Sequence, residues 1–542
     1  DLPLEVLDLE GSLLKLKKRL EEPNYLERLI EKFFINNKHR VTFQLIPNED
    51  FNKNKIEKLE KLLSEKNSSL SSSQKDNIRD LTAKLETRQN SKDDPSLLPC
   101  VTVNDIEKER FYTTGCKRED GDKIKYLYHA GTNGIDYTTK VFSLESANLD
   151  DLRYSNFFSD VVTSVGVGEK DYEKIQKEQS LSTGGIGLSF NVLPDSSGNK
   201  FLLSAGLHGS ALKKNFSKLE SLMDDTIHGF RLDEIKRLEE LTQFEIAGKE
   251  KSITQSGHIL AMNGASAQIS KFGAVSEFVG GVSSIHNLKT LRDSNGKIKM
   301  EMLLESFSKL KSFINPASKI EVVISASNQN FDKETTSKTG LETLDVLNGV
   351  DLQSEEIAWI TGSDVNFCAQ AFPTVGYDHP DAPILTVLGA VLRNGFLHSA
   401  IREKGGAYGS GAQQDSASRS FRFFSYRDPN CMETFNAFNE SIEWSLKSIN
   451  SEKLEEGILG VISSIDKPGS PAGEARADFN QNIRGIDQSK RKIFRSRVIN
   501  CSVERLVEVS NKYLTVEPKR SVISGKHFDK EIKDLGLSIH NV

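Results

Sequence analysis

The spacing of apolar residues divides the chain into helical and strand-like stretches. Between residues 10 and 36 apolar residues recur near every 3.6 positions, which predicts helix. The next segment, HRVTFQLIP (39–47), alternates between polar and apolar residues, which predicts a strand that ends at Pro47. Residues 52–90 then carry two charged amphipathic stretches around a serine-rich turn, which predicts an exposed helical hairpin between two larger bodies.

Beyond this hairpin the pattern occurs twice. A strand-like stretch from Ile135 is followed by two helical runs that end in STGGIGLS, and a strand-like stretch from Asp364 is followed by a helix from about Pro383 that ends in KGGAYGSG. TGGIGLS (183–189) and KGGAYGS (404–410) are 221 positions apart. A repeat this long indicates a duplicated α/β domain of the α+β type, in which strands and helices are mixed.

This organisation predicts four parts in the chain. They are the end of a preceding α/β domain (1–50), a charged helical hairpin linker (51–100), a first α/β domain (101–345) and a second, similar α/β domain (346–542).

In each copy a Gly-Gly pair stands where helix gives way to strand, a position that favours residues able to adopt positive φ. The 221-residue offset sets Leu181 and Gly187 opposite Arg402 and Tyr408. Two interpretations of the second pair are open. Arg402 stabilises the C-terminal end of its own helix and Tyr408 packs on a sheet, or both side chains act as hydrogen-bond donors at a site.

Three other segments give local predictions. FRFFSYRDPN (421–430) alternates as a strand, and the run after it predicts an amphipathic helix packed on that strand. In SGHILAMNGASA (256–267), His258 stands among small residues, which indicates close helix packing rather than a ligand site. DKPGSPAGEARADF (466–479) contains Pro468 and Pro471, which predicts a mobile loop.

Composition and charge exclude several classes of function. The 542 residues predict two to four domains, with the 37% apolar and 27% charged content of an ordinary soluble protein. A net charge of −6 argues against a nucleic-acid partner, and apolar runs shorter than about 18 residues argue against membrane insertion. Five scattered cysteines without CxxC spacing predict neither disulfides nor a zinc ribbon, and hence a reducing compartment.

No motif for metal or phosphate binding is found in the chain. No two histidines have HxxxH or HxxEH spacing, and the glycine-rich stretches follow helices, the wrong order for a phosphate-binding loop. The chain opens on DLPLEVLDLEG, without methionine and already in an apolar rhythm, which favours a piece of a longer polypeptide.

Three longer stretches carry a family resemblance. LHSAIREKGGAYGSGA, FRFFSYRDPNCMETF and SSIDKPGSPAGEARADF closely resemble the C-terminal half of presequence proteases, which are pitrilysin/insulinase-type zinc metallopeptidases (inverzincins). The resemblance runs the length of the chain. The opening segment is similar to the end of the family's second domain, the charged hairpin to its linker, and LSTGGIGLSFNVLPD to part of its third domain.

The resemblance implies a site without a metal of its own. In the family, four similar α/β domains close around a peptide, and an HxxEH helix in the first domain supplies zinc ligands and general base. This chain lacks that motif, so zinc would be bound by a separate N-terminal half. Arg402 and Tyr408 would be catalytic, meeting the negative charge that develops on a peptide carbonyl. Gly405, Gly406 and Ala407 would let the backbone approach the substrate and bind it.

The predicted function is therefore the C-terminal half of a zinc endopeptidase that degrades unstructured peptides, such as cleaved targeting presequences, in a closed chamber. Its predicted partners are its own N-terminal half and these peptides, and the chain alone is predicted to be inactive. The alternative is a non-catalytic structural or peptide-binding subunit of the same superfamily. The resemblance implies the mitochondrial matrix or another organelle in a eukaryote, and the cytoplasm or periplasm in a bacterium.

Overall fold

The computed structural model describes residues 5–48, 50–91, 99–120, 123–144, 147–314, 318, 320–327 and 350–542. The chain separates into two units, Asp1–Cys100 and Val101–Val542. The predicted domain boundary at 345/346 lies outside the described residues, so it stays a prediction.

The first unit is helical, and none of its described residues is buried. Its elements are η1 (Glu5–Leu7), α1 (Leu9–Leu20), α2 (Tyr25–Ile30), the π-helical η2 (Glu31–Ile35), α3 (Phe51–Ser69) and α4 (Ser72–Asn90). Helix α4 begins with a capping box, because Ser71 Oγ accepts from Gln74 N and Gln74 Oε1 accepts from Ser71 N. The predicted helices over 10–36 and 52–90 are thus present.

The strand predicted over 39–47 does not form, and this prediction was wrong. Residues 37–48 have no regular structure, and Val41, Phe43 and Leu45 are each more than 80% exposed. A strand requires a neighbour for its backbone groups, and no described strand pairs with this segment. Alternation alone therefore could not produce a strand here.

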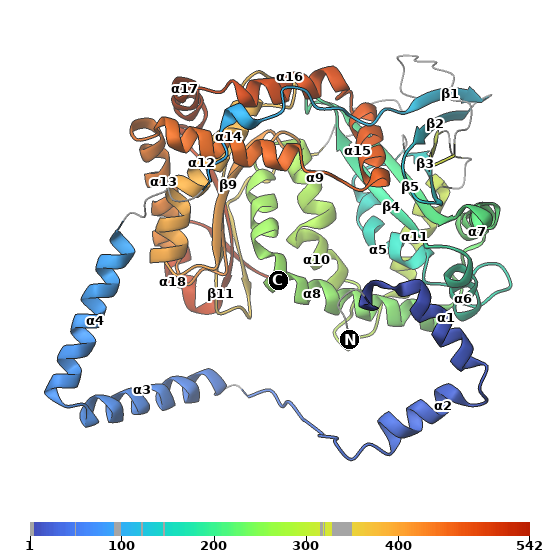
Figure 1. Ribbon diagram of the computed structural model, residues 1–542, viewed down its shortest axis with the longest axis horizontal. Helices are drawn as coiled ribbons and strands as arrows, with labels where there is room; N and C mark the ends of the chain where they lie inside the picture. Colours follow the sequence, from blue (N-terminus) through green and yellow to red (C-terminus); the bar gives the residue numbers. More distant parts are fainter. Residues whose placement is uncertain are drawn as a thin grey trace. The chain divides into compact units, whose positions relative to one another are not determined.

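The second unit contains two six-stranded mixed sheets in its described residues, with the strand orders β1-β2-β6-β3-β5-β4 and β12-β7-β11-β8-β10-β9 (Figure 1). The strands of the first are β1 (Cys116–Asp120), β2 (Lys123–His129), β3 (Ile135–Ser143), β4 (Gly185–Pro194), β5 (Phe201–Leu212) and β6 (Ile320–Ser325). Those of the second are β7 (Ile357–Thr361), β8 (Phe367–Pro373), β9 (Gly409–Asp415), β10 (Ser420–Tyr426), β11 (Lys519–Gly525) and β12 (Ser538–Asn541).

The two sheets share one topology. From β2 and β7 onward the strand orders match one to one, with β2/β6 and β7/β11 as parallel pairs and the next three pairs antiparallel. Strands β3 and β8 begin where the two copies were predicted to begin, and β4 and β9, which follow the Gly-Gly pairs, are both edge strands. This confirms the predicted fold of two similar sheet-plus-helix domains in tandem.

The two copies do not keep one register throughout. The 221-residue offset pairs Gly185 (φ +123°) with Gly406 (φ +80°), both in left-handed backbone. In the strands that follow, Leu188 and Ala412 both point to the outer helices, and they are an even number of positions apart. An odd offset exchanges the two faces of a strand. Gly187 is therefore not the strand counterpart of Tyr408.

Helices cover the outer face of each sheet. Those of the first copy are α5 (Ser155–Val162), α6 (Tyr172–Ser182), α7 (Phe216–Gly229) and α11 (Met300–Ile314). Those of the second copy are α12 (Ala382–Leu392), the π-helical η7 (Arg393–Lys404), α13 (Met432–Lys447), α14 (Ser451–Ile465), α16 (Gln488–Ile499), α17 (Val503–Leu514) and α18 (Asp529–Asp534). Single 3-10 turns are η4 (Val103–Asp105), η5 (Asp150–Leu152), η6 (Lys213–Asn215) and η8 (Lys526–Phe528).

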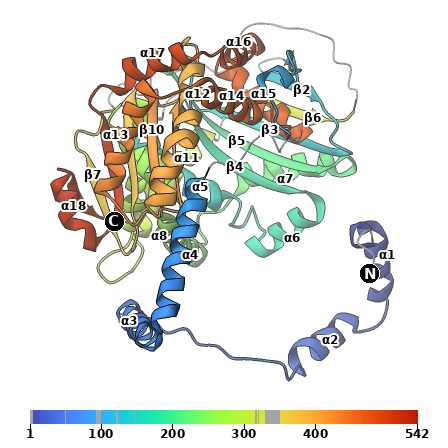
Figure 2. The ribbon, with the colours of Figure 1, turned by 60° about the vertical axis from the view of Figure 1, so that its left-hand side comes forward.

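Two helices exchange between the copies and cover the opposite sheet faces. Helix α8 (Ile235–Ser266) bends at Ser256, so that its first part joins the outer core of the first copy while its second part packs on β8, β10 and β11. The short helices α9 (Lys271–Gly280) and α10 (Val282–Lys289) follow α8 and pack against it. Helix α15 (Pro471–Ile483) packs on the first sheet, and Figure 2 shows it next to β3 and β5.

The loop predicted over 466–479 is largely this helix α15, so that prediction was wrong. Ser470 Oγ accepts from Gly473 N at 3.1 Å, and Pro471 occupies the first turn, where its missing N–H costs no hydrogen bond. Pro471 thus begins the helix rather than breaking it.

The continuous helix Ala382–Lys404 is long and apolar enough to cross a membrane by composition alone. It is the central helix of the second copy, where nine residues of α12 are buried and half of the apolar window is inside the fold.

Candidate functional site

Arg402 lies in the last turn of η7, on its exposed side. The opposite side of the turn is held in the core by Leu397 and Ile401. The Arg402 carbonyl accepts from Gly406 N at 3.1 Å, and its Nη1 lies 3.3 Å from His398 Nε2. His398 Nδ1 in turn lies 3.5 Å from Glu403 Oε1. The helix end is thus fixed by backbone bonds while the guanidinium faces outward.

The Gly-Gly turn is clamped from both sides. Gly405 N donates to Ala400 O, and Asn430 Nδ2 donates to Gly405 O at 2.6 Å. Gly406 adopts φ +80°, a conformation that disfavours other residues, and the Ala407 side chain is buried in the core. Their predicted contact with substrate through the backbone stays a prediction.

Tyr408 projects from this turn into solvent. Its backbone N–H donates to Tyr426 O at 3.1 Å, which joins the turn to β10, and its ring meets that of Tyr426 edge-on at 5.6 Å. The side chain is 68% exposed, and its hydroxyl has no hydrogen-bond partner within the described residues. The ring is therefore supported along one edge while the phenol oxygen is free to bind.

An aromatic layer holds Tyr426 in place. The imidazole of His258, on α8, lies 4.8 Å from the Tyr426 ring, and Phe367 lies 5.7 Å from it on the other side. Burial lowers the pKa of His258, so this ring is neutral near pH 7. Gly257 allows the close approach, because a Cβ there would meet the Phe367 ring at 2.5 Å. The predicted close helix packing around His258 is thus confirmed.

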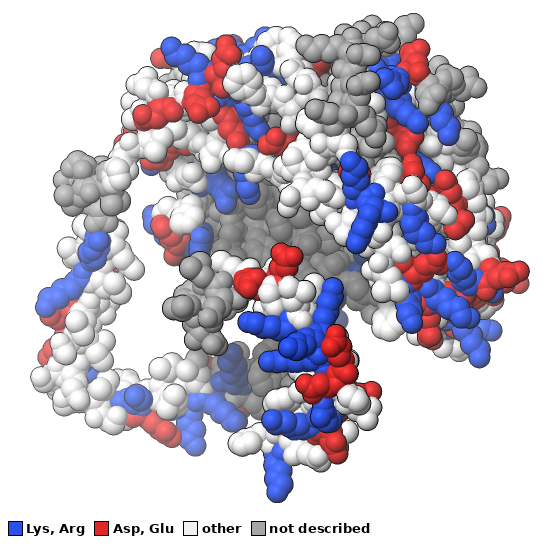
Figure 3. Space-filling model, turned by 45° about the vertical axis from the view of Figure 1, so that its right-hand side comes forward, with Lys and Arg blue, Asp and Glu red and all other residues white. Residues whose placement is uncertain are grey.

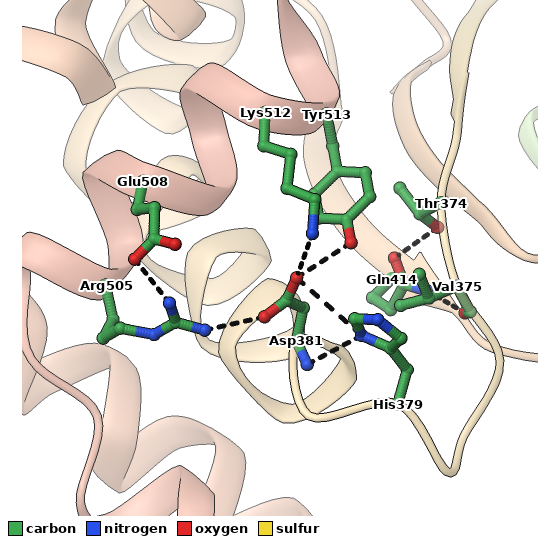
Figure 4. A network of polar contacts seen from close by, with 9 residues as sticks. All are labelled: Thr374, Val375, His379, Asp381, Gln414, Arg505, Glu508, Lys512 and Tyr513. Atoms are coloured by element: carbon green, nitrogen blue, oxygen red, sulfur yellow. Dashed lines mark hydrogen bonds and ion pairs between the residues drawn. The ribbon is translucent and has the colours of Figure 1, made fainter.

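The start of the helix that leads to Arg402 is anchored by a buried carboxylate, Asp381 (Figure 4). Arg505 and Lys512, on α17, donate to its two oxygens at 2.7 and 2.9 Å, and Tyr513 Oη donates at 2.8 Å. His379 Nδ1 accepts from Asp381 N at 3.1 Å. This network ties the first turn of α12 to α17. Nothing in the sequence pattern indicated it, because its two sides are more than a hundred residues apart.

Both interpretations of Arg402 and Tyr408 hold in part. Arg402 does end its helix and Tyr408 does contact a ring on the sheet, yet both polar ends face solvent within one short turn. His398, Tyr426 and Asn430 support this turn, and sequence reasoning assigned them no such role.

The described residues contain no group of three His, Cys, Asp or Glu side chains placed to hold a metal ion. The surface also lacks a strong field of one sign on the face in Figure 3, where acidic and basic side chains are interspersed.

Two family models match the chain. The model for the associated domain of the M16 peptidases, subfamily C, matches residues 45–291. The "PreP C-terminal domain" matches residues 363–523, which include the whole Arg402–Tyr408 turn. The relatives found along nearly the whole chain carry the name "Presequence protease, mitochondrial". The chain belongs to the presequence protease family.

Two of these relatives show the extent of the match. The presequence protease of Yarrowia lipolytica is 27% identical over 529 residues, 94% of this chain and 52% of its own length. That of Drosophila melanogaster is 28% identical over 498 residues, 90% of this chain and 48% of its own length. The chain thus spans about half the length of the curated presequence proteases it matches.

Solved structures share the fold of the second unit. A protease from Helicobacter pylori has a TM-score of 0.52 at 13% identity, covering 76% of this chain and 100% of its own. The peptidase M16 inactive domain from Pseudomonas fluorescens has a TM-score of 0.52 at 14% identity, covering 76% of this chain and 98% of its own.

Proposed function

We propose that this chain is the C-terminal half of a zinc metalloendopeptidase that degrades unstructured peptides in a closed chamber. It supplies Arg402 and Tyr408, while an N-terminal half bearing HxxEH supplies the zinc site and the general base. The observation that carries this proposal is the turn itself, where two donors face solvent from a backbone held at both ends.

The chemistry of the two donors suits peptide hydrolysis. During attack on a peptide carbonyl, negative charge develops on its oxygen, and donors fixed in advance stabilise that charge most. Arg402 brings a permanent positive charge in a planar fork, and Tyr408 brings a neutral O–H without a competing partner among the described residues. Both groups can therefore act on a substrate whose carbonyl is polarised by a zinc ion that the other half holds.

The first unit supports the need for a second half. Val41, Phe43 and Leu45 alternate along an extended segment that pairs with no described strand, and their side chains are exposed. A strand of the N-terminal half would satisfy the backbone of this segment and cover one of its faces. The mitochondrial names of the relatives support the mitochondrial matrix as the compartment.

The test is hydrolysis of a quenched, unstructured peptide of about 20 residues by this chain, alone and mixed with the upstream half. We expect no turnover by the chain alone and zinc-dependent turnover by the mixture. Loss of one transition-state donor typically lowers kcat by about 10²–10³-fold, so Tyr408→Phe and Arg402→Ala are each expected to do so. Lys404→Ala removes an exposed cation of the same turn and is the matched control, with activity unchanged.

Turnover by the chain alone, or full activity of both variants in the mixture, would contradict this proposal. The lack of a metal-ligand cluster among the described residues also fits a second function, that of a peptide-binding subunit without catalysis. Saturable peptide binding by an assembled mixture that never hydrolyses the peptide would favour it.

A further inference from the structure

A cavity of about 230 Å³ lies on the first sheet, away from the Arg402 turn. Strands β3–β6 form its floor and α15 forms one wall. Its polar lining consists of Thr139, Ser189, Asn191, Ser204, His208 and Arg476. Figure 1 shows α15 beside strands β3–β5, and the cavity lies where the helix meets them.

The polar floor is not a requirement of the fold. On the same sheet, α15 packs its apolar side on Tyr128, Val322 and Ile324, which are buried. In the second copy the equivalent face is apolar, with Phe367 and Ala369 closed over by α8. Strands β4 and β5 of the first copy instead present small polar residues at alternate positions of this face. The same architecture has thus been left open and hydrophilic at one place.

The floor has hydrogen-bonding capacity to spare. Asn191 Nδ2 donates to Ser189 Oγ at 3.3 Å, but the hydroxyls of Thr139 and Ser204 have no partner within the described residues. Gly206 lies between them, and the absence of a side chain there keeps the floor low. These groups can donate to an oxygen-rich ligand.

One positive charge in the cavity is not compensated. Arg476 stands on α15 with its guanidinium 5.0 Å from the Tyr137 ring, and no carboxylate lies within ion-pair distance of it in the described part of the chain. Among the described residues, no acidic side chain lines the cavity. Burial lowers the pKa of His208, and Arg476 lowers it further, so the imidazole is neutral near pH 7. The lining therefore carries a single cation among neutral donors.

We propose that this cavity binds a carboxylate of an extended peptide, with Arg476 as its ion-pair partner and the floor hydroxyls as donors. A planar guanidinium matches a carboxylate in a bidentate geometry, and free hydroxyls satisfy the remaining lone pairs. The volume suits the end of a peptide and not a folded surface. That the carboxylate belongs to a peptide rests on the proposed function; the carboxylate chemistry rests on the cavity.

The test uses the full chain and a labelled, unstructured ten-residue peptide in three forms. One has a free C-terminal carboxylate, one has a C-terminal amide, and one has the amide and a glutamate near its end. Affinity is measured by fluorescence anisotropy. We expect the free acid to bind at least about tenfold more tightly than the amide, since a charge-assisted pair is lost with the charge. Recovery of affinity by the glutamate form would support the carboxylate chemistry and show that side-chain carboxylates also enter.

Two variants locate the binding. Arg476→Gln is expected to lower the affinity for the free acid about tenfold or more and to remove the difference between acid and amide. Gly206→Val is expected to block binding because its methyl groups fill the cavity. A Cβ at Gly206 meets Ser189 Oγ at 3.5 Å and Thr139 Cγ2 at 3.7 Å, which is ordinary contact, so the fold is preserved. Lys214→Gln removes an exposed charge of the same copy away from the cavity and is the matched control.

Equal affinity for the acid and the amide, or unchanged binding by folded Arg476→Gln and Gly206→Val, would overturn the inference. Thermal unfolding followed by circular dichroism shows that each variant is folded. The measurement needs neither zinc nor turnover, so it is separate from the test of the proposed function. Carboxylate binding with an inactive assembled mixture would leave the cavity in place and remove the endopeptidase, and the reverse result would do the opposite.

Discussion

Replacing Asp381 by asparagine tests whether the network in Figure 4 anchors the helix that leads to Arg402. The carboxylate has a side-chain exposure of 7% and accepts from Arg505, Lys512 and Tyr513 at 2.7 to 2.9 Å. The Asp381→Asn variant keeps the shape of the side chain but loses its charge and one acceptor. It therefore weakens every contact between the first turn of α12 and α17 that passes through this residue.

The expected loss of stability is about 2–3 kcal/mol. A hydrogen bond to a charged group contributes about 1.5–3 kcal/mol, and three converge here. Their sum is not reached, because Arg505 and Lys512 are 40% and 53% exposed and regain water when the charge is removed. The asparagine oxygen also still accepts one bond. The loss is thus close to that of one strong contact rather than three.

Tryptophan fluorescence in urea measures this loss in the right part of the molecule. The chain has two tryptophans, Trp359 on β7 and Trp444 on α13, and both belong to the second copy. The ring of Trp444 lies 6.1 Å from that of Phe396 on η7, so its emission reports on the helix that ends at Arg402. The midpoint of unfolding at pH 7 is compared between the wild-type chain and Asp381→Asn.

The pH dependence provides an internal check. Burial raises the pKa of Asp381, but the hydrogen bonds from Lys512 and Tyr513 outweigh burial, so this pKa lies below the ordinary 3.8. A lowered carboxylate pKa contributes stability above the unfolded pKa and loses it as pH falls through the folded one. The difference between wild type and variant is thus constant from about pH 5 to 8 and shrinks below about pH 4.

Lys512→Met is the control, because it removes one partner that is more than half exposed, and we expect a loss below about 1 kcal/mol. An Asp381→Asn variant within about 0.5 kcal/mol of wild type at pH 7 would refute the anchoring role. A difference that persists unchanged at pH 3 would refute its electrostatic origin.

Three further predictions concern other parts of the chain. Burial raises the pKa of Glu277 to about 7, against hydrogen bonds from Ser283, so wild-type stability falls as pH rises from about 4.5 to 7; Glu277→Gln removes this fall of up to about 3 kcal/mol in melts at pH 5 and 8, and an equal fall in the variant would contradict it. Gly406→Ala costs about 1–2 kcal/mol in urea unfolding, because φ is +80° and the nearest atom is 3.7 Å away; no loss would mean that the turn relaxes. Ser71→Ala removes the α4 capping box and lowers the helicity of a 50–91 peptide by circular dichroism, by about 1 kcal/mol, which equal helicity would exclude.

Local pattern predicted much of the fold and part of the site. The 3.6-residue rhythm in α1 to α4 and the alternation in β3 and β10 led to the right elements, because backbone geometry ties these periods to helix and strand. The Gly-Gly pair located the turn at Gly406, because few residues tolerate a φ of +80°. The alternation of Ser204, Gly206 and His208 along one strand was a readable signal for the polar cavity that sequence reasoning missed.

Everything that depends on a distant partner was decided by the tertiary structure. Residues 39–47 have the alternation of a strand but find no neighbour among the described strands, whereas β4 has one in β5. Helix α15 forms directly from Pro471 because Ala475 and Phe479 bury against the first sheet. Which residues surround Asp381 or Arg476 cannot follow from local spacing, since contacts between residues far apart in sequence depend on how whole sheets and helices pack. The sequence alone determined the elements and the turn; packing determined which side chains meet.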